Sequence, residues 1–393
     1  MVKEPTEEQS KILQQKGNIV ITAKPGSGKT YTIVEKIARV IPDLPEYKGV
    51  IAISFTNKAS DELKRRCKQR CADTKQSFFG TIDKFYISQI IIPFSSHVTG
   101  NITEYEIVDN IDESSKYALL LEEPFSSKKE SILVEGLQEG KIFLKYTGET
   151  ALYILENVPG AMQYIKARYS HIIIDEYQDC GEIQDKVFIK LVESGLTGIA
   201  VGDINQAIYG FTKRFPKYLI ALMKRDDFAR FELSKNHRCH PSISEYSLCL
   251  FGASKTVPRE KRVFKVDISG DERNIAAAID KYLNQIKDKY GIVRNNQVAI
   301  LCRSNSTAFK VGENLSTPYK IFEETVLDRD NSEWGRFFRD LLSASFDESV
   351  FAAITQNNFF LKNWNLKNIE KHSRCAKVYF RIRSMIFAMQ RIR

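Results

Sequence analysis

Residues 23–30 read Ala23-Lys24-Pro25-Gly26-Ser27-Gly28-Lys29-Thr30, a glycine-rich loop that ends in Lys-Thr. An apolar run over 18–22 precedes this loop, and residues 31–37 follow it with helical spacing. Strand, glycine-rich loop and helix in this order are the setting that makes a P-loop credible. The backbone N–H groups of such a loop, with the helix N-terminus behind them, form a cage for phosphate. The stretch therefore predicts that the chain binds a nucleoside triphosphate.

Within this loop we expect Lys29 to reach the β- and γ-phosphates and the Thr30 hydroxyl to ligate Mg²⁺. The usual pattern has glycine at position 23, where this chain has alanine. The loop and the start of the helix provide these expected nucleotide-binding residues: Ala23, Gly26, Ser27, Gly28, Lys29, Thr30 and Tyr31.

Length and composition indicate a soluble protein of several domains. The chain has 393 residues, of which 43% are hydrophobic and 27% charged, and this length accommodates two or three domains. No apolar run approaches the ~20 residues that span a bilayer, and the polar N-terminus does not resemble a signal peptide. The seven cysteines are scattered, without a C-x-x-C pair. We therefore expect reduced thiols, a cytoplasmic location and no membrane association.

The net charge is +9. Nucleic acid is the commonest partner of such an excess, although lysines exposed to solvent explain it equally well. Basic residues concentrate in 64–70, and the last residues, 377–393, contain five basic side chains and no acid. Apolar positions at the end of the chain share one helical face, which fits either packing on its own domain or docking to a partner.

The sequence predicts strands that alternate with helices along most of the chain. Strand-like runs are found at 50–55, 171–174, 199–203, 263–268 and 297–302, and helical patterns follow several of them. This alternation predicts doubly wound α/β domains. Residues 95–165 differ, because runs at 132–137 and 141–147 around two glycines resemble a β-hairpin. We expect them to form an inserted subdomain.

A second motif, this one acidic, follows the isoleucine run at 172–174. The isoleucine run suits a strand buried on both faces. Asp175 and Glu176 come directly after it. Asp175 is expected to hold Mg²⁺, and Glu176 to polarise the attacking water. A P-loop together with such a carboxylate pair predicts an ATP hydrolase.

The order of the motifs resembles the UvrD/Rep/PcrA group of superfamily 1A DNA helicases. Gly202-Asp203-x-x-Gln206-x-Ile208-Tyr209-Gly210 is the most specific string. The other matching segments are 5–9, 23–30, 54–59, 79–85, 174–179 and 233–238, and 299–305 resembles the opening of a second motor domain. Asp83 and His237 stand where members of the group carry His and Tyr. The group's motifs V and VI are not recognised after Arg303.

The resemblance implies roles at the nucleotide. Gln9 is expected to read the adenine edge, because its amide donates and accepts at once, and His237 to stack on the adenine. Gln206 is expected to sense the γ-phosphate, and Arg238 to neutralise charge that develops on it. With the P-loop and acidic motifs, the expected catalytic residues are Lys29, Asp175, Glu176, Gln206 and Arg238.

The resemblance also implies a site for single-stranded DNA. Phe55, Tyr209 and Phe211 are expected to stack on bases of any sequence, although Phe55 ends a buried strand and also fits a core position. Thr56, Asn57 and Thr81 are expected to hold the phosphate backbone.

The implied fold is α/β, with tandem RecA-like doubly wound parallel sheets, a small inserted subdomain and a second motor domain that is apparently incomplete. The expected divisions are a first motor domain at 1–94 and 166–258, the inserted subdomain at 95–165, part of a second motor domain at 259–350, and a basic helical docking segment at 351–393.

Two functions are consistent with these features. The first is an ATP- and Mg²⁺-dependent DNA translocase or helicase that acts on single-stranded or tailed duplex DNA. The second is an ATP- and DNA-sensing regulatory subunit beside a nuclease partner, as in Gabija-type antiphage complexes, with little or no unwinding of its own.

Overall fold

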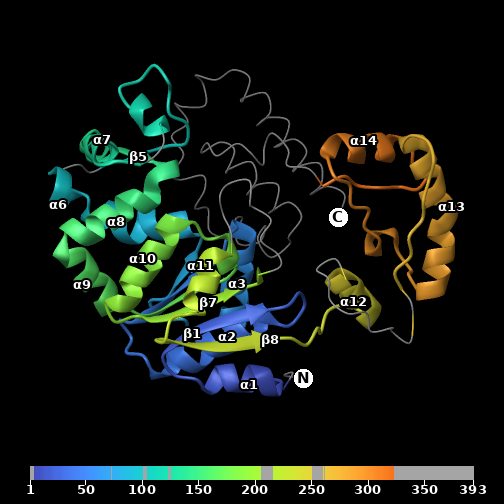
Figure 1. Cartoon of the computed structure of the whole chain (residues 1–393), viewed down its shortest axis with the longest axis horizontal. Coiled ribbons are helices and arrows are strands. Elements are labelled where there is room, and N and C mark those ends of the chain that lie inside the picture. Colours follow the sequence, from blue (N-terminus) through green and yellow to red (C-terminus); the bar gives the residue numbers. More distant parts are fainter. Residues whose placement is uncertain are drawn as a thin grey trace, which may run out of the picture. The chain divides into compact units, whose positions relative to one another are not determined.

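The computed structural model describes residues 4–71, 73–100, 104–122, 125–204, 216–249, 260 and 262–322. The chain divides into two compact units, Met1–Phe264 and Lys265–Arg393 (Figure 1). Of the residues with expected roles, Gln206, Tyr209 and Phe211 lie outside the described ranges, as does the docking segment at 351–393. In the described part of the chain, no helix is both long and apolar enough to cross a membrane.

A six-stranded, entirely parallel sheet forms the centre of the first unit. Its order is β3-β2-β6-β7-β1-β8, and its strands are β1 (Asn18–Ala23), β2 (Gly49–Ile53), β3 (Phe78–Gly80), β6 (Tyr169–Ile174), β7 (Thr197–Gly202) and β8 (Phe228–Leu233). The register pairs Ile21 with Val201 on one side and Phe231 on the other. This is the expected α/β, RecA-like arrangement, and the carboxyl ends of all six strands lie at one edge, where such sheets bind ligands.

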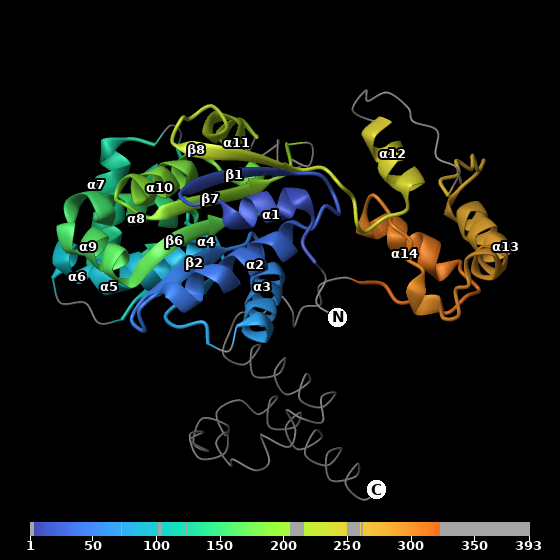
Figure 2. The same cartoon turned by 90° about the horizontal axis from the view of Figure 1, so that it is seen from below.

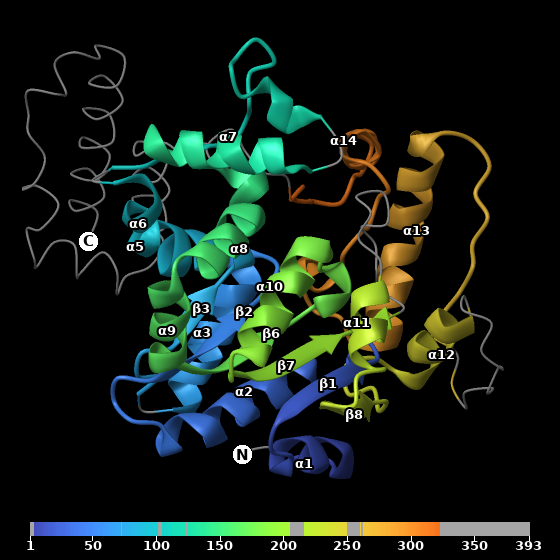
Figure 3. The ribbon, with the colours of Figure 1, turned by 60° about the vertical axis from the view of Figure 1, so that its left-hand side comes forward.

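Helices cover both faces of this sheet (Figures 2 and 3). Alternate strand side chains enter two separate cores, as period-2 geometry requires: Ile172 and Ile174 face one core and Ile173 the other. The Ile173 side packs against α1 (Glu7–Gln14), α2 (Lys29–Val40) and α3 (Asn57–Arg70). The opposite side packs against the π-helical η2 (Tyr86–Ile91), α8 (Thr147–Asn157), α9 (Pro159–Arg168) and α10 (Glu182–Glu193).

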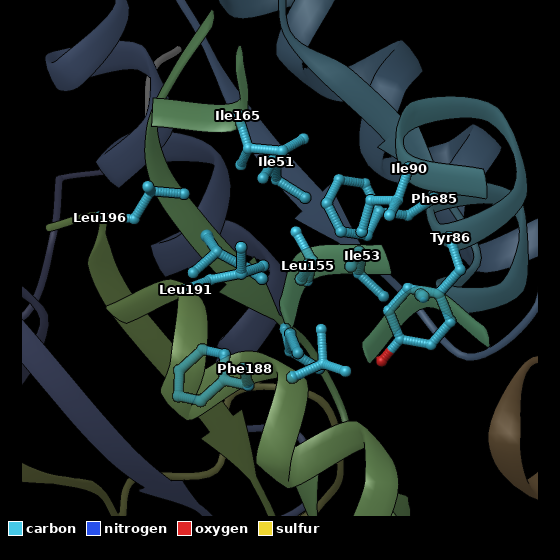
Figure 4. Close-up of a cluster of buried hydrophobic side chains, with 14 of the residues drawn as sticks. Ile51, Ile53, Phe85, Tyr86, Ile90, Leu155, Ile165, Phe188, Leu191 and Leu196 are labelled. Carbon is cyan, nitrogen blue, oxygen red and sulfur yellow. The ribbon is translucent and has the colours of Figure 1, made fainter. Parts of the chain in front are cut away.

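The larger core lies between the sheet and the second set of helices (Figure 4). Ile51 and Ile53 of β2 meet Phe85 and Ile90, and all four are almost fully buried. Each such side chain stabilises the fold by about 1.5–3 kcal/mol relative to an exposed one. This packing holds the loops at the carboxyl edge in place.

The structure corrects the expected hairpin within the insertion. Residues Ser127–Gln138 form helix α7, and β5 (Lys141–Phe143) pairs in parallel with β4 (Glu106–Val108). Leu133, Gly136 and Leu137 are buried at helical spacing. The β-branched Ile132 and Val134 favoured a strand, but the residues buried at helical spacing show that the segment forms a helix.

The second unit contains α13 (Glu272–Tyr290) and α14 (Asn305–Glu313) in its described part. The Asp280 carboxylate of α13 accepts hydrogen bonds from the backbone N–H groups of Ser316 (2.7 Å) and Thr317 (3.2 Å), which fastens the chain after α14. The strands expected at 263–268 and 297–302 are wrong within the described residues, because neither segment has a ladder partner there. Val266 is 59% and Leu301 94% exposed, whereas a strand of a doubly wound sheet is buried on both faces.

The other described helices are short and connect these elements. They are α4 (Ile82–Phe85), α5 (Ile92–Phe94), α6 (Ser96–Thr99), α11 (Lys217–Leu222), α12 (Pro241–Cys249), and the 3-10 turns η1 (Ile41–Asp43), η3 (Ala118–Leu121), η4 (Leu144–Tyr146), η5 (Tyr177–Asp179) and η8 (Asn295–Gln297).

Candidate active site

The glycine-rich loop connects β1 to α2 at the carboxyl edge of the sheet. Gly26 and Gly28 adopt left-handed φ angles of 74° and 90°, which glycine reaches without strain. A Cβ on Gly28 would meet the Gln9 Nε2 at 2.8 Å, and one on Gly26 would meet the Arg238 Cβ and the Asn236 Oδ1 at 2.8 Å. These two glycines are therefore required by backbone angle and by space.

Three further features of the loop suit a phosphate ligand. No side chain caps the N-terminus of α2, so its first N–H groups are available to a ligand. The Ser27 Oγ is buried and has no hydrogen-bond partner among the described residues. Ala23 is buried in the core below the loop, which accommodates its methyl group in place of the usual glycine. Lys29, Thr30 and Tyr31 form the first turn of α2 and are partly buried.

The acidic pair follows β6, two strands from β1 in the sheet. The Asp175 side chain is buried, and its backbone N–H donates to the Ile53 oxygen at 3.0 Å. Burial, with the nearby charge of Glu176, raises the pKa of the Asp175 carboxyl to about 6. Asp175 therefore occupies a position where a bound cation stabilises its charged form.

Glu176 adopts a left-handed backbone conformation, with φ 58° and ψ 41°. Its Oε2 accepts hydrogen bonds from the Lys29 Nζ and the Gln178 Nε2, each at 2.8 Å. A non-glycine residue in this conformation stores strain that is common at functional sites. The structure thus brings together two of the expected catalytic residues, Lys29 and Glu176, as a partly buried ion pair.

Gln178 is a site residue that the sequence analysis did not single out. Its side chain is buried, donates to Glu176 and accepts from the backbone N–H of Asp203 at 2.9 Å. It therefore connects the acidic pair after β6 with the end of β7. Its position two residues after Glu176, within the matched 174–179 string, was the available signal.

Gln9 reaches the loop from α1. Its Oε1 accepts from the Thr6 backbone N–H at 3.0 Å, which completes a capping box, and its Nε2 donates to the Ser27 oxygen at 3.4 Å. One amide proton and one lone pair of Gln9 remain for a base. The structure therefore brings Gln9 to the P-loop, as the resemblance implies.

The segment after β8 also approaches the P-loop. The backbone N–H of His237 donates to the Gly26 oxygen at 2.8 Å. Asn236, a second residue that the sequence analysis missed, accepts from the N–H groups of Arg238 (2.8 Å) and Cys239 (2.9 Å). The exposed side chains of His237 and Arg238 are thus carried on a turn held beside the loop.

Those residues expected at DNA that the structure describes gather at the ends of β2 and β3. The backbone of Ser54 bonds to Gly80 at 3.1 Å and joins the two strand ends. Thr56 caps α3, and Thr81 caps α4. Asn57 is exposed. Phe55 packs against the core but is only partly buried, so its environment is compatible both with a core position and with stacking on a base.

Asp83 lies near these residues and has a structural partner. Its Oδ1 accepts a hydrogen bond of 2.7 Å from the buried hydroxyl of Thr147 at the start of α8. The carboxylate therefore anchors the insertion to α4, and this contact explains an acidic residue at a position where members of the resembled group carry His.

A family model described as an AAA domain matches residues 7–212, more than half of the chain. The chain belongs to this family. The matched range includes the P-loop, the acidic pair and the ends of β2 and β3.

Individual relatives narrow this assignment. The chain is 29% identical over 331 residues to the Gabija protein GajB of Bacillus cereus (strain VD045), covering 81% of this chain and 64% of that protein. It is 27% identical over 362 residues to DNA helicase II of Haemophilus influenzae, covering 78% of this chain and 49% of that one. The ATP-dependent DNA helicase PcrA of Staphylococcus aureus (strain Mu50 / ATCC 700699) is 26% identical over 248 residues, 52% of this chain and 34% of that one.

These similarities, with the ordered motifs, support the resemblance to UvrD/PcrA-like superfamily 1 helicases and to the Gabija protein GajB. They support a helicase-like ATPase as its general class. The chain spans between about a third and two thirds of the length of these relatives.

Proposed function

We propose that this chain hydrolyses ATP with Mg²⁺ and couples the hydrolysis to movement along single-stranded DNA. The ion pair of Lys29 and Glu176 at 2.8 Å carries the proposal, because it places a phosphate-binding cation beside a carboxylate able to polarise water. The same edge of the sheet presents an uncapped helix N-terminus to phosphate.

The donor atoms at this edge fit Mg²⁺. A hydroxyl from Thr30 and a carboxylate from Asp175 are the hard oxygen ligands that this cation selects, and the raised pKa of Asp175 indicates that its charge lacks full compensation in the protein alone. When bound, Mg²⁺ neutralises charge on the β- and γ-phosphate oxygens.

The protein's own residues then have separate roles in hydrolysis. Lys29 leaves Glu176 and binds the phosphates, which frees Glu176 to orient and polarise the attacking water. Gln178 fixes the Glu176 carboxylate, and Arg238 neutralises charge developing at the γ-phosphate. Gln9 and His237 contact the base.

The described part of the proposed DNA surface consists of Phe55, Thr56, Asn57 and Thr81. These residues follow β2 and β3, and β2 also pairs with β6, which Asp175 directly follows. A small displacement of the residues that contact the phosphates is therefore transmitted to the proposed DNA-binding residues through the adjacent ends of β6 and β2. The positive net charge favours a nucleic-acid partner.

A steady-state ATPase assay, with and without a single-stranded oligonucleotide, tests this function. We expect the oligonucleotide to stimulate turnover and the stimulation to disappear in Phe55→Leu, which keeps apolar bulk but removes the stacking ring. Tyr47→Leu is the matched control, since Tyr47 precedes the opposite end of β2 and is 65% exposed. Equal stimulation of all three proteins would refute the DNA surface.

The similarity to GajB over 81% of this chain favours a second candidate. In this role the chain senses ATP and DNA within a complex with a nuclease partner and separates strands weakly or not at all. A tailed DNA duplex distinguishes the two roles: strand separation by the chain alone supports the motor, whereas DNA-stimulated ATPase without strand separation supports the sensor.

A further inference from the structure

Lys36 is a buried lysine whose ammonium group is fully engaged. It lies on α2, two turns after Lys29, and is 8% exposed; lysine is rarely buried to this extent unless paired. Its Nζ donates hydrogen bonds to the backbone oxygens of Ile12 (3.2 Å), Leu13 (3.3 Å) and Gln15. An ammonium group has three protons, so these three carbonyls satisfy it completely.

These carbonyls belong to the C-terminal end of α1. The last carbonyls of a helix have no partner within it and carry partial negative charge, which a cation stabilises. The helix has only eight residues, fewer than an isolated helix needs to be stable. Lys36 therefore holds the end of a helix that cannot sustain itself.

The opposite end of α1 is also held by a segment of the site. The Glu8 carboxylate accepts from the backbone N–H of Ser234 at 2.9 Å and from its hydroxyl. Ser234 directly follows β8, three residues before His237. Between the two attachments, Gln9 donates to the Ser27 oxygen of the P-loop.

We propose that Lys36 is a positioning residue for base recognition: it fixes α1 on the P-loop helix, so that Gln9 meets the base of a nucleotide whose phosphates are held by Lys29. This inference rests on the proposed ATP binding. It implies that loss of Lys36 impairs the discrimination of the base and spares the contacts to the triphosphate.

Two measurements on Lys36→Met test the proposal. Methionine keeps the apolar stem and removes the three donors. Hydrogen exchange is expected to accelerate about 10-fold or more at the backbone amides of 11–15, since hydrogen bonds to a charged group each contribute about 1.5–3 kcal/mol. Binding of ATP is expected to weaken about 10-fold, whereas binding of inorganic triphosphate, which has no base, changes less than about twofold.

Two further variants make the binding result specific. Gln9→Ala is expected to show the same selective loss, and the double variant no additional loss, because the two residues act through one contact. Lys11→Met is the matched control: Lys11 lies on the same helix, but its side chain is 65% exposed and pairs with Glu7 at the surface. It is expected to leave both affinities unchanged.

The outcomes separate this inference from the proposed function. Equal weakening of ATP and triphosphate, additive losses with Gln9→Ala, or unchanged amide exchange would overturn the positioning role. If the unmodified chain binds neither ATP nor triphosphate, the proposed function fails, and exchange at 11–15 alone decides whether Lys36 holds α1. If Lys36→Met does not fold, Glu8→Ala removes the acceptor that binds the other end of α1 to Ser234 and is expected to give the same selective loss of ATP binding.

Discussion

Replacement of Glu176 by glutamine is expected to separate binding from hydrolysis. Glutamine keeps the shape of the side chain but removes the charge that polarises water. Because positioned acid–base groups contribute about 10²–10⁴-fold to a rate, kcat is expected to fall by that amount. ATP affinity is expected to move in the opposite direction.

The gain in affinity follows from the ion pair. In the structure, Lys29 and Glu176 are joined at 2.8 Å, with side chains 13% and 36% exposed. Solvent screening limits such a pair to about 1 kcal/mol, and this interaction must be broken before Lys29 can bind phosphate. Without it, ATP is expected to bind about fivefold more tightly.

Isothermal titration measures the ATP affinity, and a coupled assay measures kcat with and without oligonucleotide. Glu182→Gln is a suitable control, because Glu182 pairs with Lys186 on the exposed surface of α10. A Glu176→Gln protein whose kcat stays within about threefold of the original would refute the assignment of Glu176. Weaker ATP binding by this variant would refute the competition between Glu176 and phosphate for Lys29.

Three other substitutions test separate parts of the structure. Burial raises the pKa of the Asp175 carboxyl in the folded protein above its value in the unfolded chain, so the stabilising contribution of its protonated form is present below pH 4 and is lost as the pH rises through about 6. Without metal or nucleotide, Asp175→Asn is therefore expected to add about 3 kcal/mol to the free energy of unfolding at pH 8 and little at pH 4. Equal urea denaturation curves of the two proteins at pH 8 would contradict this. Thr147→Val removes the 2.7 Å hydrogen bond to Asp83 and is expected to lower the free energy of unfolding, measured by urea denaturation, by about 1.5–3 kcal/mol. A change within about 0.5 kcal/mol, the usual range for a surface substitution, would mean that the contact is not stabilising. Gly28→Ala places a non-glycine residue at a φ of 90° and brings its Cβ to 2.8 Å from the Gln9 Nε2. ATP binding, measured by isothermal titration, is expected to weaken at least about 10-fold. Undiminished affinity would contradict this loop geometry.

Much of the first unit could be predicted from sequence, because β1, β2, β6 and β7 are short, continuous apolar runs. Strand β8 was missed, since Phe228–Leu233 is not a continuous apolar run like the other strands and lies at the edge of the sheet beside a strand some 200 residues earlier. Helix α7 was mistaken for a strand because its β-branched residues outweighed its buried spacing.

The candidate site could likewise be predicted only in part. That Lys29, Asp175 and Glu176 lie together at one edge of the sheet could be predicted, because each belongs to a motif of a few residues that directly follows a strand. Lys36, Gln178 and Asn236 make hydrogen bonds to backbone atoms that are distant in sequence or lie within a turn. Gln178 and Asn236 lie in matched strings, but no part of those strings indicates these contacts, and Lys36 lies in none. The roles assigned to the site residues remain predictions, and for Gln206, Tyr209 and Phe211 the position does as well.

The strand order also determines when this protein can fold. Strand β1, which leads into the P-loop, pairs with β7 and β8 on its two sides, so it acquires neighbours only after residues 197–233 have been synthesised. Most of the first unit must therefore leave the ribosome before the nucleotide site can assemble. Pairing between segments so far apart in the chain is slow, and the apolar β1 remains a target for chaperones until then. The order of synthesis thus keeps the ATP site from forming before the sheet that supports it is nearly complete.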